Sequence, residues 1–457
     1  MHRDPSEQTT SSKTSRRKFL ATGTAVSVGA AAVAAMPRPA LGFHNSVDDA
    51  LKVGLVGCGG RGTGALMNVI QADSRTQVTA LADAFMDRVN LTVDSLKTDR
   101  PENFNVTPDS IFTGVDCHEK LVNADVDIVC LATPPHFRPA QMEAAVRAGK
   151  HVFCEKPVAV DVPGARRVLA ACKEAESKGL SVVSGLCWRY DDGVNEVINR
   201  IHDGHIGEVR AIEANYLAGT LWYRTPPKDV EWSSMENQLR NWLYFNWLSG
   251  DHTAEQHIHS IDKALWVMGD VPPVSCHALG GRLARTEEKW GNVYDHFATN
   301  FEWADGRKVF SQCRQMDDCF NQTNDMVYGT EGLAKILSFT IEKKGGYTWK
   351  FKGAKESMYV NEHIALLNSI RNGVPINNGE YMVNSTVMAL MARDAAYTGK
   401  KIMWDKYMES EIVLGPKSYD EADYVPDPVA IPGKNGKRKI WGKIPVPKSK
   451  PPSKNAK

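Results

Sequence analysis

The chain has 457 residues, of which 42% are hydrophobic and 24% are charged, so it is long enough for two globular domains with a large buried core. Its 55 lysines and arginines nearly balance its 54 aspartates and glutamates, and the formal net charge is +1. This balance excludes the broad basic surface typical of proteins that bind nucleic acid. The nine cysteines form no C-x-x-C pair, so the sequence predicts neither a disulfide framework nor a structural metal.

Residues 1–42 have the pattern of a twin-arginine signal peptide. Residues 15–20 read S-R-R-K-F-L, an alanine-rich apolar run continues to Met36, and residues 40–42 offer small side chains for cleavage. A transmembrane anchor is the alternative, but the run is short and is interrupted by Pro37 and Pro39. We therefore expect recognition by the twin-arginine export machinery, a periplasmic or secreted location and no stable membrane span.

Residues 51–83 predict a dinucleotide site. An apolar run ends in the spacing G-x-G-x-x-G, formed by Gly57, Gly59, Gly60, Arg61 and Gly62 with Cys58 between the first two glycines. The first glycine permits a tight turn, the second lets the backbone approach a pyrophosphate, and the third lets a helix pack closely on the strand. The N-terminus of that helix attracts phosphates. Asp83 follows the next strand-like run, where a carboxylate binds the adenosine ribose hydroxyls.

The segment from residue 43 to residue 185 alternates strand-like and helix-like patterns. The predicted strands are residues 51–56, 77–82, 126–132, 151–154 and 180–184, and the predicted helices are residues 64–71, 138–148 and 161–178. This alternation predicts an α/β fold with a Rossmann-type, doubly wound parallel sheet. We assign these residues to an NAD-binding domain.

Beyond residue 186, longer segments alternate apolar and polar residues, which predicts antiparallel strands at residues 209–216, 274–279, 296–303 and 308–314. Helices are predicted at residues 362–371 and 381–398. We assign residues 186–415 to an α+β domain for substrate binding and oligomerisation, with a large, mainly antiparallel sheet. A loop-rich insert at residues 219–248 carries four tryptophans, which favours either a carbohydrate-contacting surface or aromatic packing. The lysine- and proline-rich residues 416–457 are assigned to a tail.

Two predicted parallel strands end in polar residues at the sheet edge where α/β folds bind ligands. One strand is followed by Thr133, Pro134, Pro135 and His136, and the next by Glu155, Lys156 and Pro157. A lysine beside the cationic ring of oxidised nicotinamide would have a lowered pKa, which suits proton transfer with a substrate hydroxyl. A surface lysine at a turn is the alternative.

Residues 251–268 predict one helix with a polar stripe. Positions three or four apart share a face, and this face carries His252, Glu255, His259 and Asp262. The opposite face is apolar and can pack on the core, with Ile258, Ile261, Leu265 and Met268. Two imidazoles on the stripe indicate proton-transfer groups in a cleft, and a solvated helix face is the alternative. A metal bound by His252, Glu255 and His259 is a further alternative, but we expect no metal because the H-x-H pair at residues 257–259 diverges on a helix.

Together these motifs resemble the glucose–fructose oxidoreductase/inositol dehydrogenase (Gfo/Idh/MocA) family. The resemblance covers residues 51 to about 405, and the matching pieces are residues 57–62, 133–136, 148–157, 185–190, 259–262 and 368–373. It implies a two-domain, NAD-dependent oxidoreductase that acts on a CH–OH group of a sugar, cyclitol or glycoside. It also implies a homo-oligomer, either a dimer or a tetramer. With the export signal, the chain looks like a secreted member of the family.

The resemblance implies a role for each matching residue. Lys156 exchanges a proton with the substrate hydroxyl, a cis peptide bond precedes Pro157, and His259 is a second proton-transfer or orienting group. Glu255 stands where the family commonly has aspartate, which leaves the role of this acid open. Asp83 resembles the acid of members that prefer NAD, because a carboxylate there repels a 2′-phosphate.

The predicted site follows from these roles. The predicted catalytic residues are Lys156, His259 and Glu255. The predicted cofactor contacts are Gly57, Gly59, Gly60, Arg61, Gly62, Asp83, Thr133, Pro134, His136, Glu155, Lys156 and Arg189. The predicted substrate contacts are Lys156, Arg189, His252, His259 and Asp262. Two other functions stay open: a glycosidase or lyase that uses tightly bound NAD in a transient oxidation and elimination, and a non-catalytic nucleotide-binding protein.

Overall fold

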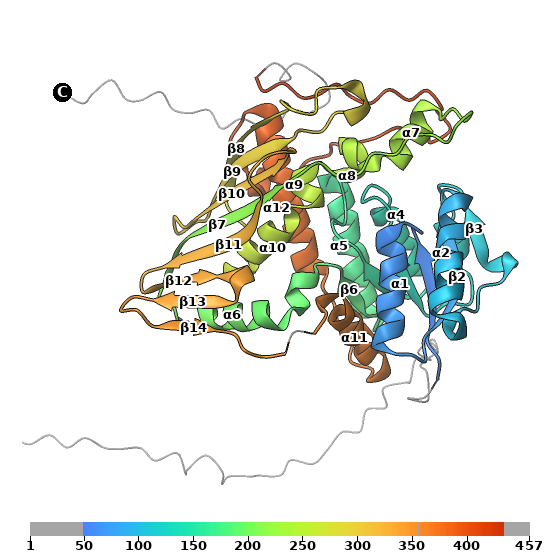
Figure 1. Ribbon diagram of the computed structural model, residues 1–457, viewed down its shortest axis with the longest axis horizontal. Coiled ribbons are helices and arrows are strands. Elements are labelled where there is room, and N and C mark those ends of the chain that lie inside the picture. Colours follow the sequence, from blue (N-terminus) through green and yellow to red (C-terminus); the bar gives the residue numbers. More distant parts are fainter. Residues whose placement is uncertain (1–48, 355, 434–457) are drawn as a thin grey trace, which may run out of the picture. The chain divides into compact units, whose positions relative to one another are not determined.

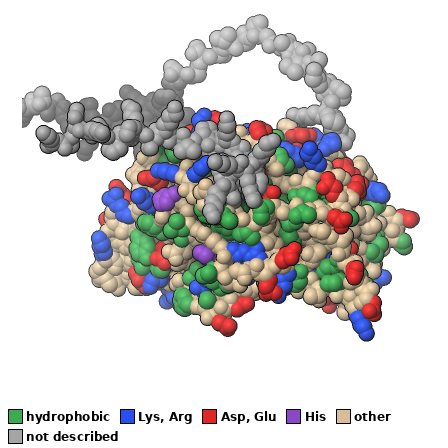
Figure 2. Space-filling model, turned by 90° about the horizontal axis from the view of Figure 1, so that it is seen from above, with side chains coloured by type: hydrophobic (Ala, Val, Ile, Leu, Met, Phe, Trp, Pro, Cys, Tyr) green, Lys and Arg blue, Asp and Glu red, His purple; other side chains and the backbone are tan. Residues whose placement is uncertain are grey.

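The computed structural model describes residues 49–354 and 356–433, so the predicted signal peptide and residues 434–457 lie outside the described part. Within the described residues no helix combines the length and the apolar character that crossing a membrane requires. On the face drawn in Figure 2, basic and acidic side chains are interspersed, as the near-zero net charge leads one to expect.

The first domain is built on a parallel sheet of six strands in the order β3-β2-β1-β4-β5-β6 (Figure 1). The strands are β1 (Lys52–Val56), β2 (Gln77–Asp83), β3 (Ile111–Thr113), β4 (Ile128–Leu131), β5 (His151–Cys154) and β6 (Val182–Ser184). The connecting helices are α1 (Gly60–Ala72), α2 (Met86–Asp99), α3 (His118–Leu121), α4 (Arg138–Arg147) and α5 (Val162–Ser177). The strand order reverses between β1 and β4, where such sheets bind ligands. The predicted doubly wound sheet is confirmed, and β3 is an addition.

The second domain is built on a nine-stranded sheet in the order β14-β13-β12-β11-β7-β10-β9-β8-β15. Its strands are β7 (Val209–Ala218), β8 (Ser275–Gly281), β9 (His296–Glu302), β10 (Lys308–Gln315), β11 (Gln322–Gly329), β12 (Gly332–Lys335), β13 (Thr340–Lys343), β14 (Thr348–Lys350) and β15 (Ile402–Met403). β7 and β10 pair in parallel, and the other neighbours are antiparallel. The prediction of a large, mainly antiparallel sheet is therefore confirmed.

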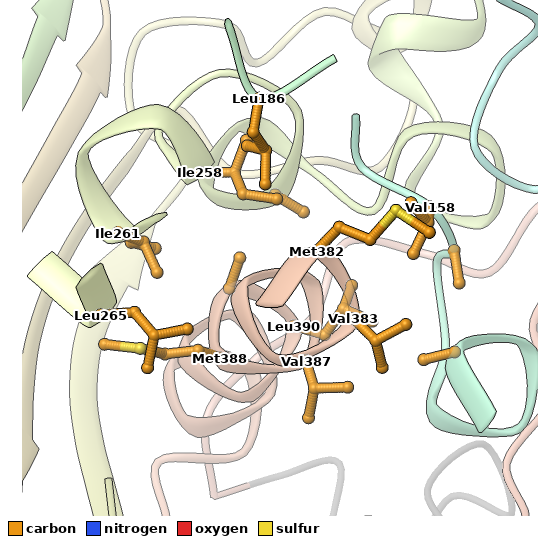
Figure 3. Close-up of a cluster of buried hydrophobic side chains, with 14 of the residues drawn as sticks. Val158, Leu186, Ile258, Ile261, Leu265, Met382, Val383, Val387, Met388 and Leu390 are labelled. Carbon is orange, nitrogen blue, oxygen red and sulfur yellow. The ribbon is translucent and has the colours of Figure 1, made fainter. Parts of the chain in front are cut away.

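The helices of the second domain join the two sheets. They are α6 (Asp192–His202), α7 (Ser234–Arg240), α8 (Asn246–Ser249), α9 (His252–Glu255), α10 (Ile258–Val267), α11 (Met358–Arg371), α12 (Gly379–Thr398) and α13 (Trp404–Met408). α11 packs on α1, and α12 packs on both α5 and β8. Figure 3 shows apolar side chains of α12 meeting those of α10 and of two segments that follow β5 and β6. One continuous core thus fixes the position of α10 relative to the first domain.

The prediction of a single helix from residue 251 to residue 268 is wrong. α9 ends at Glu255 and α10 begins at Ile258. At the break the N–H of His257 bonds to the carbonyl of His252, at 3.1 Å, and the ring of His257 bonds Ser311 of β10, at 2.5 Å. Because His257 is anchored on the sheet, the chain turns there, and the four polar residues no longer share one face.

The first part of the predicted tail, residues 416–433, lies along the surface of the folded chain and is held there by hydrogen bonds. The main-chain carbonyl of Asp427 accepts a hydrogen bond from Asn292, at 2.8 Å, and that of Ala430 accepts one from Tyr294, at 2.9 Å. Just before this part, the N–H of Leu414 donates to Asp161 of the first domain, at 3.0 Å. Side chains distant in the sequence bind the main chain of this segment, which composition alone does not reveal.

Candidate active site

The glycine-rich loop between β1 and α1 fits a pyrophosphate. Gly57 has a φ of +102°, and a Cβ there would lie 2.6 Å from the main-chain carbon of Ala132. A Cβ on Gly62 would lie 1.9 Å from the carbonyl oxygen of Gly57. In contrast, a Cβ on Gly59 or Gly60 would meet nothing within 4 Å. The first and last glycines are therefore needed for packing, while the middle two leave open space at the N-terminus of α1, where a pyrophosphate binds in such folds.

A pocket extends from this loop to the end of β2. Asp83 lines it together with Gly57, Gly59, Thr133 and Pro134. The Asp83 carboxylate accepts hydrogen bonds from the N–H groups of Cys58, at 2.7 Å, and Phe85, at 3.0 Å, and burial raises the pKa of this carboxyl. A carboxylate oxygen can accept more than one hydrogen bond, so ribose hydroxyls can still donate to Asp83. The five residues therefore line one pocket, and their contacts with NAD stay a prediction.

Arg61 and Glu155 were predicted to contact the cofactor, but they bind each other. Arg61 Nε donates to Glu155 Oε1, and Arg61 Nη2 lies 3.0 Å from Glu362 Oε1 of α11. Burial, followed by the nearby charge of Glu155, raises the pKa of Glu362 well above its ordinary value. These three side chains brace the phosphate loop against α11, and neither Arg61 nor Glu155 lines the nucleotide pocket.

His136 lies outside the pocket that Asp83 lines. Its ring lies among aromatic side chains and bonds the hydroxyl of Tyr419, at 2.7 Å. It lines a different pocket, formed with residues 413–420. Burial lowers the pKa of His136 to about 4, so the ring is neutral at pH 7. The main contribution of the motif at residues 133–136 to the nucleotide pocket comes from Thr133 and Pro134.

Lys156, Glu255 and His259 meet where the two domains join. Lys156 follows β5, and its peptide bond to Pro157 is cis. Its Nζ donates to the main-chain oxygen of Glu255, at 2.5 Å, and lies 3.3 Å from Glu255 Oε1. The side chains of the pair are 15% and 14% exposed, so both are largely withdrawn from bulk solvent.

His259 stands in the first turn of α10 beside this pair. Burial lowers its pKa well below the ordinary value, and the positive charges of Lys156, Lys263 and Arg61 add to the shift. The imidazole is therefore neutral at pH 7 and able to accept a proton or a hydrogen bond. Its Nδ1 is buried and has no hydrogen-bond partner among the described residues.

Two residues of this cluster were not predicted from the sequence. Lys263 is fully buried, and its Nζ donates to the main-chain oxygen of His259, at 2.7 Å, and lies 3.0 Å from Asp325 Oδ2. Tyr216 of β7 lies close enough to Glu255 for that charge to raise its pKa, in addition to burial. Neither a single lysine in a helix nor a tyrosine in an alternating strand forms a motif. The sequence therefore does not predict that these two residues lie beside Glu255 and His259.

Arg189, Asp262 and His252 are engaged elsewhere. Arg189 Nη2 lies 2.9 Å from Asp262 and 2.6 Å from Asp270, and its guanidinium stacks on Tyr381, 3.8 Å from the ring centroid. Asp262 is 1% exposed and also accepts a hydrogen bond from Ser385. His252 is 2% exposed and packs edge-on against Tyr216. All three predicted substrate contacts are thus engaged with other side chains of the protein, and their contact with a substrate stays a prediction.

In the described ranges no group of three or more histidine, cysteine or acidic side chains has an arrangement that could hold a metal ion. Of the alternative ligand set, His252 and Glu255 lie in α9 and His259 lies in α10, beyond the break.

Two family models match the chain. Residues 51–183 match the model described as "Oxidoreductase family, NAD-binding Rossmann fold", and residues 194–335 match "GFO/IDH/MocA C-terminal domain". The two matches together span more than half of the chain.

Among curated relatives, a 2,7-anhydro-N-acetylneuraminate hydratase of Escherichia coli is 28% identical over 213 residues, which are 46% of this chain and 51% of that protein. An inositol 2-dehydrogenase of Rhizobium meliloti is 26% identical over 309 residues, which are 64% of this chain and 86% of that protein. Alignments with three of the most similar relatives span only 60%, 51% and 57% of those proteins.

Among solved structures, levoglucosan dehydrogenase in complex with NADH and levoglucosan superposes with a TM-score of 0.60 at 17% identity. The match covers 78% of this chain and 99% of that chain. At this identity the likeness establishes the common fold.

Proposed function

Because the chain belongs to the Gfo/Idh/MocA family of NAD-binding oxidoreductases, we propose that it oxidises a CH–OH group of a sugar, cyclitol or glycoside with NAD. The observation that carries this proposal is the meeting of Lys156 and neutral His259 at the carboxyl edge of the NAD-binding sheet. The named activities of relatives, an inositol dehydrogenase and a levoglucosan dehydrogenase, support the substrate class.

In this mechanism the chain supplies position and proton transfer. The bound nicotinamide supplies the hydride acceptor. Lys156, held by the main chain and carboxylate of Glu255, acts as the neutral amine, whose Nζ takes the hydroxyl proton of the substrate. His259 assists as a neutral imidazole, either by orienting the hydroxyl or by receiving the proton. Because the side chains of Lys156 and Glu255 are largely buried, solvent competes little for the contacts between them.

A second candidate is bond cleavage or hydration through transient oxidation. A relative is named a hydratase, and addition of water changes no net oxidation state. In this course the hydride removed from one carbon returns to the substrate before the product leaves. A third candidate, a nucleotide-binding protein without turnover, is disfavoured because Lys156 and His259 are both present and close enough for the charge of Lys156 to lower the pKa of His259.

An assay of the full chain with a panel of cyclitols, anhydro sugars and glycosides tests the proposal. We expect a rise in absorbance at 340 nm with NAD and little or none with NADP, because Asp83 at the ribose end repels a 2′-phosphate. Product analysis by mass spectrometry in the same samples separates the candidates. Cleaved or hydrated product without accumulated NADH would favour the second candidate, and no product from any member of the panel would contradict both.

We further propose that residues 15–20 direct the chain to the twin-arginine export machinery and hence to a periplasmic or secreted location. The doubly changed chain with Arg16→Lys and Arg17→Lys should stay in the cytoplasm, because the guanidinium pair is the recognised feature. Fractionation of cells and immunoblotting would measure this. The matched control is Arg3→Lys, which lies upstream of the motif. Export of the double variant at the normal level would refute the proposal.

A further inference from the structure

The nucleotide pocket is bordered by the second domain on the side where Asp83 would meet the adenosine ribose. One rim follows β2 and consists of Asp83, Ala84, Phe85 and Arg88, and the facing rim comes from the insert at residues 219–248 and consists of Arg224, Leu239, Arg240 and Trp242. Figure 1 shows α7, which ends at Arg240, beyond the ends of the first domain's helices α2 and α4. Two parts of the chain more than a hundred residues apart therefore form one pocket.

Arg240 bridges the two rims. Its Nη1 and Nη2 each lie 3.1 Å from an oxygen of the Asp87 carboxylate in the first turn of α2. Its guanidinium lies over the ring of Phe85, 3.9 Å from the centroid, while its Nε donates to Glu236 at 2.8 Å. The side chain is only 12% exposed. A bidentate and stacked arginine is held in one orientation, so this contact is stronger than an ordinary surface ion pair.

Arg224 adds a second guanidinium to the same rim. Its main chain is fixed by buried Asn241, which accepts from the Arg224 N–H at 2.8 Å and donates to the Arg224 carbonyl at 3.0 Å. Its guanidinium lies over Trp222, 4.6 Å from the centroid. Burial lowers its pKa, and the positive charges of Arg88 and Arg240 add to this shift. Throughout residues 49–354 and 356–433 no carboxylate pairs with Arg224, so its donors are available to an anionic ligand.

The insert is itself anchored. The N–H of Met235 donates to the carbonyl of Ala422 at 2.9 Å, and the side chains of Ser234 and Gln238 both donate to the carbonyl of Tyr424, at 2.7 and 2.8 Å. The indole of Trp247 donates to Gln238 at 2.8 Å. These contacts hold α7 in place, so the rim over the pocket is a built element of the fold.

We propose that the insert at residues 219–248 is a clamp on the adenosine half of the dinucleotide, and that it retains the nucleotide between turnovers. Arg224 donates to the phosphates of the nucleotide, and the bridge from Arg240 to Asp87 must open before the nucleotide can leave. The inference goes beyond the proposed function, because it concerns nucleotide exchange and holds for any reaction on the substrate. A retained nucleotide favours reactions in which the hydride returns to the substrate before the product leaves the site.

Release of NADH from the full chain tests the clamp. Protein freed of nucleotide is loaded with NADH and mixed with a large excess of NAD, and the loss of NADH fluorescence gives the release rate. Loss of a charged hydrogen-bonded pair commonly changes an equilibrium by about tenfold or more. We therefore expect Arg240→Gln and Asp87→Asn each to release NADH at least about tenfold faster than the unchanged chain.

Arg200→Gln is the matched control. Arg200 also bonds a glutamate four residues before it, Glu196, and also stacks on an aromatic ring, that of Trp349, but it does not line the nucleotide pocket. Its release rate should equal that of the unchanged chain. Arg224→Gln should weaken equilibrium binding of NADH, measured by calorimetry, by about tenfold.

Asp87 is 52% exposed, so Asp87→Asn should fold normally even if Arg240→Gln does not, and thermal melting would verify this. Release rates within twofold of the unchanged chain in both bridge variants would overturn the clamp. No carbohydrate is present in this experiment. A negative result for the clamp is therefore independent of whether the proposed oxidation of a carbohydrate takes place.

Discussion

Replacing Lys156 with alanine should lower turnover by about 10²–10⁴-fold or more while NAD binding stays nearly unchanged, because general acid–base groups contribute on this scale. Lys156 Nζ is directed to Glu255 in the second domain, and the pyrophosphate-binding loop lies on another strand of the sheet. Steady-state rates with the substrate found by the panel, and calorimetric titration with NAD, measure the two effects separately.

Lys150→Ala is the control for this change. Lys150 precedes β5 and, like Lys156, donates from Nζ to a main-chain oxygen, that of Val126, at 2.8 Å. It lies at the opposite end of the strand, so its loss should leave turnover unchanged. Full activity of Lys156→Ala would refute the mechanism.

His259→Ala should lose activity on the same scale as Lys156→Ala, and the double variant should lose far less than the product of the two losses, because both groups serve one proton transfer. Glu255→Gln distinguishes two roles of the acid. Its main-chain oxygen, which receives the shorter contact from Lys156, is unchanged by the substitution. A small effect would mean that the carboxylate only orients its neighbours, whereas an effect as large as that of Lys156→Ala would identify it as the base.

Local patterns were sufficient to predict the nucleotide half of the molecule. The roles of Gly57 and Gly62 follow from backbone geometry within one strand–turn–helix unit, and the structure has the close contacts that exclude side chains there. Asp83 is likewise placed by β2, whose last residue it is. The apolar side of residues 258–268 was also predicted correctly, because burial of Ile258, Ile261 and Leu265 depends on helical spacing alone.

The remaining features depend on partners that are distant in the sequence. Arg61 binds Glu362, which lies 301 residues later and is buried beside it. Arg189 likewise forms ion pairs with Asp262 and Asp270, which are also distant from it in the sequence. The helix breaks at His257 because Ser311 of β10 binds its ring. A charged or aromatic side chain in a motif indicates which chemistry is available. The orientation of that side chain depends on the opposite charge that the fold places beside it.

Buried histidines should make the stability of this protein fall as the pH drops below about 6.5. Burial lowers the pKa of His363 and of His257 to about 3, whereas in the unfolded chain each titrates near its ordinary value of about 6.5. Between these two values the unfolded state binds more protons than the folded state, so the free energy of unfolding decreases with falling pH. Asp251 acts in the opposite direction below pH 6, because burial raises its pKa to about 6.

The contribution of one histidine can be isolated with His363→Leu. His363 is fully buried against Phe153, and its ring nitrogens have no hydrogen-bond partner in the described part of the chain. Integration of the linkage for a pKa moved from about 6.5 to about 3 gives a loss of about 2 kcal/mol between pH 7 and pH 5. Urea unfolding followed by tryptophan fluorescence at both pH values should therefore show a smaller decrease of the free energy of unfolding in His363→Leu than in the unchanged chain, by about 2 kcal/mol.

The control is His277→Gln, at an exposed residue of β8, which should show the same decrease as the unchanged chain. An equal decrease of the free energy of unfolding in all three proteins would show that His363 takes up its proton in the folded state. The protonated ring would then need a polar partner, and the described residues around it provide none.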